Sequence, residues 1–555
     1  MFINKTFECN IIPDELLTQK IQDNANYKET LENKIKLLND LKNTNISESK
    51  DFITYCEFCN QSLKCLLRPY QYIASYYLCL GDGGFDFSVP GSGKTIISYA
   101  SYNYFREQNI CSHILIIGPI NSWNAWHDEY ITCFDKEPDF ISLADKPRDE
   151  SLAYLLSSNN NHKEITFVNI DKAWRMQREI IKFLQNKKVL LIIDEAHKEK
   201  NPKAKITKAV LEITKHAKCR IILTGTPMPN GYEDLYSLMK IYSPYKKILP
   251  YSYSDLKNIT KKGANEVQRT RIMKSIFPLY SRVSKRYLFD TGELIEPKFT
   301  FVECEMSEEQ TKIYDFLDKM AFQLIDDFES ALNINLMKAI LIRKMQISAN
   351  PGLLLKSIIK TIDEYKKEYI DDFDKEDSDN ELLIKADNEI MKLVNQSDIV
   401  KIVNLFDNNI INTPKNELAA KLALNLVENK EKVIIWDVFV QNMYAIEQII
   451  HKKYTGSIEI INGSVTGIER QQAIDNFKYG DSMILIANPA TLAESISLHK
   501  ACQTAIYVNK NYNAAQYIQS KDRIHRINMP KGKTAKYYFL INKNTIDEKV
   551  QKRLD

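Results

Sequence analysis

The chain alternates short, almost uninterrupted apolar runs with stretches of helical periodicity, and this pattern constrains its fold more than any other feature. The clearest runs are HILIIGP (113–119), EITFVN (164–169), VLLIIDE (189–195), CRIILTG (219–225), KVIIWD (432–437), SIEIING (457–463), SMILIAN (482–488) and TAIYVN (504–509). Runs of this kind are typical of parallel strands whose two faces are both covered by helices. They fall into two sets, roughly 67–245 and 415–545, which predicts two α/β lobes separated by a helix-rich middle.

The composition is that of an ordinary globular protein, with 44% hydrophobic and 26% charged residues over 555 positions. Ten scattered cysteines fit a reducing cytosol better than a disulfide framework. No apolar run approaches the roughly 18 residues of a membrane span, and the start MFINKTFECNIIPDELL lacks the regions of a signal peptide. We therefore expect neither membrane insertion nor secretion.

The formal net charge of +3 hides two regions of opposite sign. Residues 246–286 carry eleven Lys or Arg, opposed only by Asp255 and Glu266, whereas residues 363–389 hold twelve acids and four Lys. The basic run is either a solvated face or a surface for a phosphate backbone, which proteins contact chiefly through Lys and Arg. The acidic run is either a solvated loop or a screen over such a phosphate-backbone surface.

A phosphate-binding loop is indicated by VPGSGKT (89–95), which precedes the helical pattern IISYASYNYF. In such a loop backbone N–H groups cradle phosphate oxygens, Lys94 reaches the β- and γ-phosphates, and the Thr95 hydroxyl holds Mg²⁺. Ser88 stands where the full pattern has glycine, so a glycine-rich turn at a helix start is the alternative.

An acidic box follows about a hundred residues later, where the run VLLII ends in Asp194-Glu195-Ala196-His197. A buried strand that ends in two acids supplies the carboxylates for a metal ion and for an attacking water, which a phosphate loop alone lacks. Asp194 can hold the Mg²⁺ shell, and Glu195 can orient or deprotonate an attacking water. The two motifs together predict a site for ATP and Mg²⁺, with Thr95 and Asp194 on the metal.

Further motifs in the same order make the chain resemble a superfamily-two helicase-type motor with a DEAH box, and more closely the Swi/Snf family of DNA-translocating ATPases. The resemblance covers residues from about 67 to 548. The matching segments are LRPYQ (67–71), GSGKT (91–95), ILIIGPINSWNAWHDEY (114–130), DEAHKEKNP (194–202), LTGTPMPNGYEDLYSL (223–238), EPKFTFVECEMSEEQTKIY (296–314), IRKMQISANPGLL (342–354), KVIIWDVF (432–439), INGSVTGIERQQAIDNF (461–477) and QYIQSKDRIHRIN (516–528).

The resemblance implies a nucleotide pocket in which Gln71 reads the adenine edge. Arg523 and Arg526 would act as arginine fingers from the second lobe, because a guanidinium is always charged and forks onto phosphate oxygens. The nucleotide-binding residues would be Arg68, Gln71, Gly91, Ser92, Gly93, Lys94, Thr95 and Gln519.

The resemblance also implies residues that grip nucleic acid or couple it to the nucleotide. These are Pro119, Ser122, Thr224, Thr226, Gly463, Ser464, Arg470 and Glu494. One motif departs from the family, which commonly reads Gly-x-Gly-Ile-Asn-Leu where this chain has Ala493-Glu494-Ser495-Ile496-Ser497-Leu498. Losing two glycines should stiffen that turn.

The resemblance predicts two RecA-like lobes. We expect an N-terminal helical region at 1–66 and an ATP-binding lobe at 67–296, whose basic helical protrusion covers about 246–290. A linker and a helical insertion that includes the acidic run should occupy 297–414, and the second lobe 415–555.

The implied function is an ATP-dependent translocase on double-stranded DNA that displaces or remodels bound proteins, gripping the backbone without regard to sequence. A strand-separating DNA or RNA helicase is the alternative, and a non-catalytic nucleotide-gated scaffold is an alternative of another class. Targeting should need a protein partner. The Lys-, Asn- and Ile-rich composition favours a bacterium, phage or mobile element, hence the cytoplasm, or the nucleus if the source is eukaryotic.

Smaller signals have plain explanations. Cys56 and Cys59, with Cys65 nearby, form only half of a zinc site, so core or solvent-facing thiols are the simpler interpretation. His197 should couple to neighbouring motifs rather than bind metal. The tryptophans should be core residues, although one of them can stack on a base.

Overall fold

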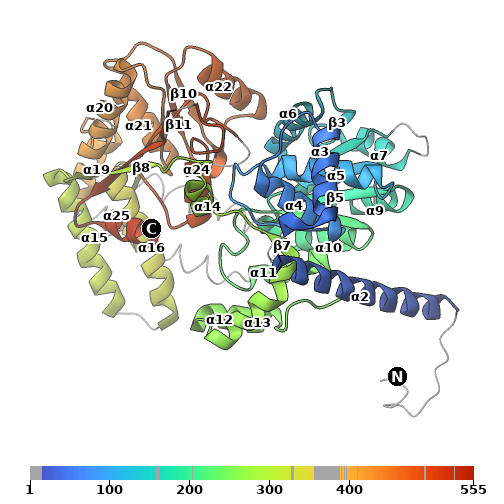
Figure 1. Ribbon diagram of the computed structural model, residues 1–555. Coiled ribbons are helices and arrows are strands. Elements are labelled where there is room, and N and C mark those ends of the chain that lie inside the picture. The colour runs from blue at the N-terminus through green and yellow to red at the C-terminus, as the bar shows by residue number, and fades with distance from the viewer. Residues whose placement is uncertain are drawn as a thin grey trace. The chain divides into compact units, whose positions relative to one another are not determined.

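The computed structural model describes two compact units, Met1–Thr291 and Gly292–Asp555, each with its own parallel sheet (Figure 1). The residues that it describes are 15–44, 46–157, 162–199, 201–202, 204–326, 330–354, 388, 390–392, 394, 397–408, 410–492, 496–530 and 532–554. The acidic residues at 363–387 lie outside these ranges. Among the described residues, no helix has the length and apolar character to cross a membrane.

The sheet of the first unit has seven parallel strands in the order β3-β4-β2-β5-β6-β1-β7. Its strands are β1 (Gly83–Asp86), β2 (His113–Gly118), β3 (Phe140–Ser142), β4 (Ile165–Asn169), β5 (Val189–Ile193), β6 (Cys219–Leu223) and β7 (Tyr280–Ser281). The four apolar runs of this half form β2, β4, β5 and β6, which confirms the expected parallel α/β lobe. β1, β3 and β7 are short and were not among the expected strands.

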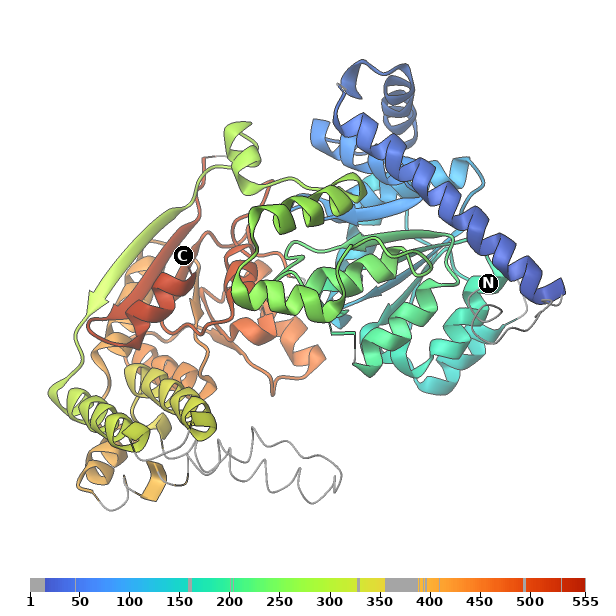
Figure 2. The same ribbon diagram turned by 90° about the horizontal axis from the view of Figure 1, so that it is seen from below.

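Helices cover both faces of this sheet (Figure 2). Strand β5 shows why, since Val189, Leu191 and Ile193 enter one core while Leu190 and Ile192 enter the other. One core is completed by α7 to α11, and the other by α3 to α6. The helices are α2 (Glu15–Lys42), α3 (Lys50–Ser62), α4 (Pro69–Leu80), α5 (Lys94–Glu107), α6 (Trp123–Phe134), α7 (Arg148–Leu156), α8 (Ile170–Arg175), α9 (Gln177–Asn186), α10 (Lys205–Thr214), α11 (Asp234–Tyr242), α12 (Tyr253–Lys262), α13 (Glu266–Ile276) and α14 (Lys285–Asp290).

The long helix α2 is fastened to the first unit near its C-terminal end. The Lys42 ammonium lies 4.3 Å from the ring centre of Phe277 and 4.2 Å from that of Tyr280, and it donates to both backbone carbonyls. Such cation–π contacts stabilise a partly desolvated charge. Tyr77 donates to the carbonyl of Leu38 one turn earlier. The N-terminal helix is therefore part of the first unit.

The sheet of the second unit has six parallel strands in the order β10-β11-β9-β12-β13-β8. They are β8 (Lys298–Cys304), β9 (Val433–Trp436), β10 (Ile458–Ile461), β11 (Ile484–Ala487), β12 (Thr504–Tyr507) and β13 (Lys536–Asn542). The four apolar runs of this half form β9 to β12, which confirms the second α/β lobe. Residues 298–304, expected in a linker, instead form an edge strand, because Phe299 and Phe301 stack on Tyr537 and Phe539 of β13.

Helices of the second unit cover its sheet and build a small separate core around Ile313, Leu317, Val403 and Phe406. These helices are α15 (Glu308–Asp326), α16 (Ser330–Ala349), α19 (Ile399–Asp407), α20 (Pro414–Glu428), α21 (Val440–His451), α22 (Gly467–Tyr479), α23 (Pro489–Leu492), α24 (Ala514–Lys521) and α25 (Ile546–Leu554).

Candidate nucleotide site

The predicted phosphate loop, VPGSGKT (89–95), lies between β1 and α5, and its last two residues, Lys94 and Thr95, begin α5. Gly91 and Gly93 have φ angles of 80° and 86°, in the left-handed region that side chains disfavour. A Cβ on Gly93 would also lie 2.3 Å from Nε2 of Gln71. The loop therefore needs glycine at this position. It leads into a helix N-terminus, where free backbone N–H groups commonly bind an anion.

Lys94 lies on the carbonyl groups of its own loop. Its Nζ donates to the Ser88 carbonyl oxygen at 3.1 Å and reaches that of Val89 at 3.5 Å. The Ser88 hydroxyl accepts from the backbone N–H of Val283 at 3.0 Å, so a hydroxyl here ties the loop to the segment after β7. Thr95 follows in the first turn of α5.

Helix α4 braces the loop from outside. Oε1 of Gln71 accepts from the backbone N–H of Arg68 at 2.9 Å, and its Nε2 donates to the Ser92 carbonyl at 3.1 Å. The Tyr70 hydroxyl donates to the same carbonyl at 2.9 Å. Both ends of the Gln71 amide are thus engaged by protein, and its reading of adenine stays a prediction. Tyr70 belongs to the segment LRPYQ but was assigned no role, because the sequence does not show which carbonyl its hydroxyl reaches.

Asp194 follows β5, and the charge of Lys94, the residue after the phosphate-loop glycines, acts on its carboxyl. Its Oδ1 accepts from the backbone N–H of Glu195 at 3.0 Å, and its Oδ2 accepts from Nε1 of Trp126 at 3.2 Å. Burial and the adjacent Glu195 carboxylate raise the pKa of Asp194 to about 6, whereas Trp126 and Lys94 oppose the rise. The charge of Lys94 thus acts on Asp194, and Trp126 holds the same carboxyl by a hydrogen bond.

The acidic box is joined by hydrogen bonds to the motif that follows β6. Nδ1 of His197 lies 3.3 Å from a Glu195 carboxylate oxygen and 3.1 Å from the Thr224 hydroxyl, which also accepts from the backbone N–H of Thr226 at 3.2 Å. Glu195 itself has a φ of 51°, a left-handed conformation uncommon outside glycine. His197 therefore contacts the coupling motif, as expected.

Two of the residues expected to grip nucleic acid from the first unit lie inside it. The Ser122 hydroxyl donates to the Pro119 carbonyl at 2.8 Å, and Ser122 and Thr224 are both buried. A Cβ on Gly118 would meet Ser122 Oγ and Asp194 Cβ, each at 3.1 Å. This segment therefore packs directly against the acidic box, and its role in gripping nucleic acid stays a prediction.

The arginine motif of the second unit is tied to that unit by its own hydrogen bonds. Gln519 and Arg523 are buried, and Nη1 of Arg523 donates to the Ile496 carbonyl at 2.9 Å. Nε of Arg526 donates to the Asp522 carbonyl at 2.8 Å. The action of both arginines on a nucleotide stays a prediction.

The remaining expected contacts of the second unit follow β10. Gly463 and Ser464 are exposed, and the Ser464 hydroxyl donates to Oδ1 of Asn462 at 2.6 Å. Arg470 donates to a backbone carbonyl of the same loop at 3.1 Å. Exposed backbone of this kind suits a sequence-independent contact. Glu494 lies outside the described residues.

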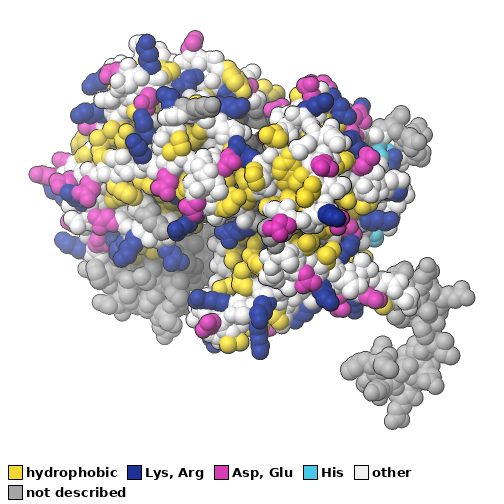
Figure 3. Space-filling model, in the orientation of Figure 1, with side chains coloured by type: hydrophobic (Ala, Val, Ile, Leu, Met, Phe, Trp, Pro, Cys, Tyr) yellow, Lys and Arg dark blue, Asp and Glu magenta, His cyan; other side chains and the backbone are white. Residues whose placement is uncertain are grey.

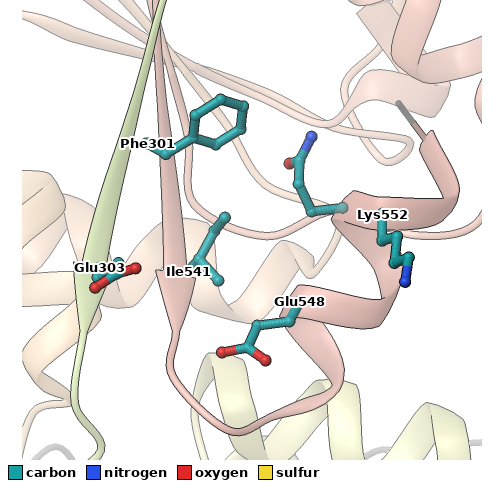
Figure 4. A pocket seen from close by; sticks show the side chains of 6 residues that line it. Phe301, Glu303, Ile541, Glu548 and Lys552 are labelled. Atoms are coloured by element: carbon teal, nitrogen blue, oxygen red, sulfur yellow. The ribbon is translucent and has the colours of Figure 1, made fainter.

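Two other features of the described chain lie apart from this site. Cys65 Sγ lies 3.7 Å from Cys133 Sγ, and no three His, Cys, Asp or Glu side chains in the described ranges gather as a metal site. In the second unit a shallow pocket opens between β8, β13 and α25 (Figure 4). It is lined by Phe301, Glu303, Ile541, Glu548, Gln551 and Lys552.

The donors at the nucleotide site fit Mg²⁺. Thr95 offers a hydroxyl oxygen and Asp194 a carboxylate, and this small cation prefers hard oxygen ligands together with substrate phosphates. Each Asp194 oxygen accepts a single N–H, which leaves further lone pairs for a cation or its water.

Comparison with known families agrees with this site. A family model described as SNF2-related domain matches residues 78–353, and one described as Helicase conserved C-terminal domain matches residues 414–528. The chain belongs to the SNF2 family of helicase-type ATPases. The resemblance drawn from the motifs is confirmed.

Curated relatives are similar over most of this chain. It is 26% identical over 499 residues to the ATP-dependent helicase fft3 of Schizosaccharomyces pombe, covering 83% of the chain and 52% of that relative. It is 26% identical over 525 residues to the CHD3-type chromatin-remodeling factor PICKLE of Arabidopsis thaliana, covering 88% and 33%. The chain thus spans about half, or less, of these relatives. The solved Sulfolobus solfataricus SWI2/SNF2 ATPase core in complex with dsDNA matches at 22% identity and a TM-score of 0.38, over 88% of this chain and 91% of that one.

The Trp126–Asp194 hydrogen bond predicts a pH effect. A bond to the ionised carboxylate lowers its pKa, so Trp126→Phe should raise the pKa of Asp194 above about 6. Magnesium-dependent binding of a fluorescent ADP needs the ionised form of Asp194. As the pH is lowered, this binding should therefore weaken with a midpoint roughly half a pH unit higher in Trp126→Phe than in the wild type. Trp436→Phe is the matched control, because Trp436 is equally buried but its Nε1 has no partner in the described chain. An unshifted midpoint in Trp126→Phe contradicts the assignment.

Proposed function

We propose that this chain is an ATP-hydrolysing motor that moves along double-stranded DNA and displaces or remodels bound proteins. The observation that carries the proposal is the meeting of Lys94, Asp194 and Glu195 at the carboxyl edge of one parallel sheet, within a SNF2-related domain. That edge is where open α/β sheets bind nucleotides.

Each residue of the site has a distinct part in hydrolysis. Lys94 leaves its loop carbonyls to hold the β- and γ-phosphates, and Glu195 orients the attacking water. Thr95 and Asp194 would hold Mg²⁺, which would supply positive charge to the phosphates as negative charge moves to the leaving group. Arg523 and Arg526 complete the site by stabilising the transferred phosphoryl group.

The hydrogen bonds from the acidic box give hydrolysis a path to the rest of the first unit. Glu195, His197 and Thr224 are linked in series, and the backbone N–H of Thr224 donates to the Asp86 carbonyl of β1 at 3.1 Å. A change of charge at Glu195 during hydrolysis therefore reaches the motif after β6 and the strand that leads into the phosphate loop. This arrangement supports a coupling role for Thr224 and Thr226.

The helices α12 and α13 support DNA as the track. Figure 3 shows Lys and Arg side chains gathered over them, and their inward positions are apolar, with Leu256 and Ile272 buried. Six of their cations are exposed and form no ion pair within the described chain. These are Lys257, Lys261, Lys262, Arg269, Arg271 and Lys274. Unpaired exposed cations suit a phosphate backbone.

The names of the relatives bear on the substrate and the location. Two yeast relatives are called ATP-dependent helicases, a plant relative is called a chromatin-remodeling factor, and a zebrafish relative is called a chromodomain-helicase-DNA-binding protein. This supports a nuclear protein acting on chromosomal DNA and gives no support to the bacterial or phage origin expected from composition. Targeting would come from a protein partner. Strand separation and a non-catalytic scaffold are the competing functions.

An ATPase assay tests the proposed function. We expect turnover to rise by roughly tenfold or more with duplex DNA, less with single strands and least with RNA, because duplex DNA is the proposed track. Lys94→Ala should remove turnover with every polymer, since it takes away the phosphate-binding cation. Greatest stimulation by RNA contradicts the DNA proposal, and no turnover with any polymer favours the scaffold.

The basic helices generate a separate prediction. Replacing Lys257, Lys261 and Arg271 by alanine should weaken duplex binding equally for all sequences and lower the slope of log affinity against log salt by about 2 to 3. The matched control replaces Lys421, Lys430 and Lys452, which are exposed lysines of the second unit. Titration of a labelled duplex at several salt concentrations measures both slopes. Equal slopes in the two variants contradict the assignment of α12 and α13.

A further inference from the structure

A third acid, Asp86, lies beneath the phosphate loop. It is the last residue of β1, two positions before Ser88, and its side chain is fully buried. Burial raises the pKa of the Asp86 carboxyl, and the charge of Lys94 opposes that rise. Neither the motifs nor the mechanism above uses this acid.

The two carboxyl oxygens of Asp86 have unequal partners. Oδ1 accepts from the backbone N–H of Ser88 at 2.9 Å, which fixes the first bend of the loop. Oδ2 is buried and has no hydrogen-bond partner in the described chain. A buried carboxylate with an unpartnered oxygen is costly unless a positive charge lies near it.

The second unit contains an instructive counterpart, Asp437, directly after β9. Its side chain is also fully buried, and Oδ1 accepts from the backbone N–H two residues later, that of Phe439, at 2.8 Å. Its Oδ2, however, accepts from Asn442 at 2.7 Å and from Asn509 at 2.8 Å. In Asp437 both carboxyl oxygens therefore have donors from the protein. Asp86 has a donor on Oδ1 alone.

Lys94 is the cation that compensates Asp86. Its ammonium group stabilises the ionised forms of Asp86 and of Asp194, so one positive charge serves two buried acids. The same ammonium is held on the Ser88 carbonyl, and Ser88 is the residue whose N–H binds Asp86. Lysine, acid and first bend of the loop thus form one connected unit.

We propose that Asp86 is a positioning residue whose negative charge holds Lys94 on the carbonyls of its own loop, so that nucleotide phosphates must compete with it for that cation. The inference rests on the proposed function, because it assigns the same loop to a nucleotide. Its consequence is a weaker hold on ADP, which speeds product release and keeps the motor cycling.

Removing only the charge of Asp86 and removing its whole carboxyl group should have opposite effects on the affinity for ADP. Asp86→Asn keeps an oxygen for the Ser88 N–H but removes the charge, so affinity for ADP should rise about fivefold and ADP release should slow by a similar factor. Asp86→Ala removes the oxygen as well and should weaken binding through a loosened loop. A merely structural acid would give weaker binding in both variants.

The effect should also depend on pH. Because its pKa is raised, Asp86 ionises at a higher pH than a surface aspartate, and only the ionised form holds Lys94 back. The difference between wild type and Asp86→Asn should therefore be smallest in acid and largest in alkali. The other titratable groups that interact with this carboxyl are Lys94 and Tyr70, and burial raises the pKa of Tyr70 to about 12, so it stays neutral.

The test measures dissociation constants and release rates of fluorescent ADP for the full chain, in wild type, Asp86→Asn and the control Asp437→Asn, across a range of pH. We expect tighter binding and slower release only in Asp86→Asn. Unchanged or weaker binding in that variant overturns the inference. If thermal denaturation shows that Asp86→Asn does not fold, Asp86→Ser, which keeps an acceptor oxygen and lacks the charge, decides by the same criterion. Wild type that binds ADP but hydrolyses no ATP refutes the proposed function alone, whereas wild type that binds no ADP refutes both.

Discussion

The electrostatic constraint on which the first unit depends is the sharing of one ammonium group between two buried acids. Lys94 follows the loop after β1, and Asp194 follows β5. In the sheet only β6 lies between these two strands, so the strand order brings the lysine charge near the aspartate charge. Asp86 makes that balance unequal, because the charge of Lys94 opposes the raised pKa of both carboxyl groups. In the proposed function, a nucleotide at the phosphate loop competes for the same ammonium group.

In the proposed function, hydrogen bonds link the nucleotide site to the rest of the first unit. His197 bridges Glu195 and Thr224, and Thr224 returns to β1 through the Asp86 carbonyl. The path closes on itself, since β1 leads directly into the phosphate loop. The acidic box, the coupling motif and the phosphate loop are therefore joined by hydrogen bonds, although they are far apart in sequence.

The sequence predicted the strands that are almost uninterrupted apolar runs, because burial on both faces leaves that signature. It missed the short strands β1, β3 and β7, and also β13 and its edge neighbour β8, of which Lys298 to Phe301 are exposed. Lys94, Asp194 and Glu195 were recognisable because each belongs to a motif with fixed spacing. The sequence assigned no role at the site to Trp126, Tyr70 or Asp86. Their partners are the Asp194 carboxylate, the Ser92 carbonyl and the Lys94 charge, and only the folded structure brings these groups close.

The central claim is that hydrolysis at this site drives movement along duplex DNA, and displacement of a third strand from a DNA triplex tests it most directly. We predict ATP-dependent displacement by the wild type and none by Glu195→Gln, which should still bind nucleotide because Lys94 and Asp194 are intact. A forked duplex without a third strand should stay paired. Unwinding of the fork without displacement of the third strand, or displacement that persists in Glu195→Gln, would contradict the account.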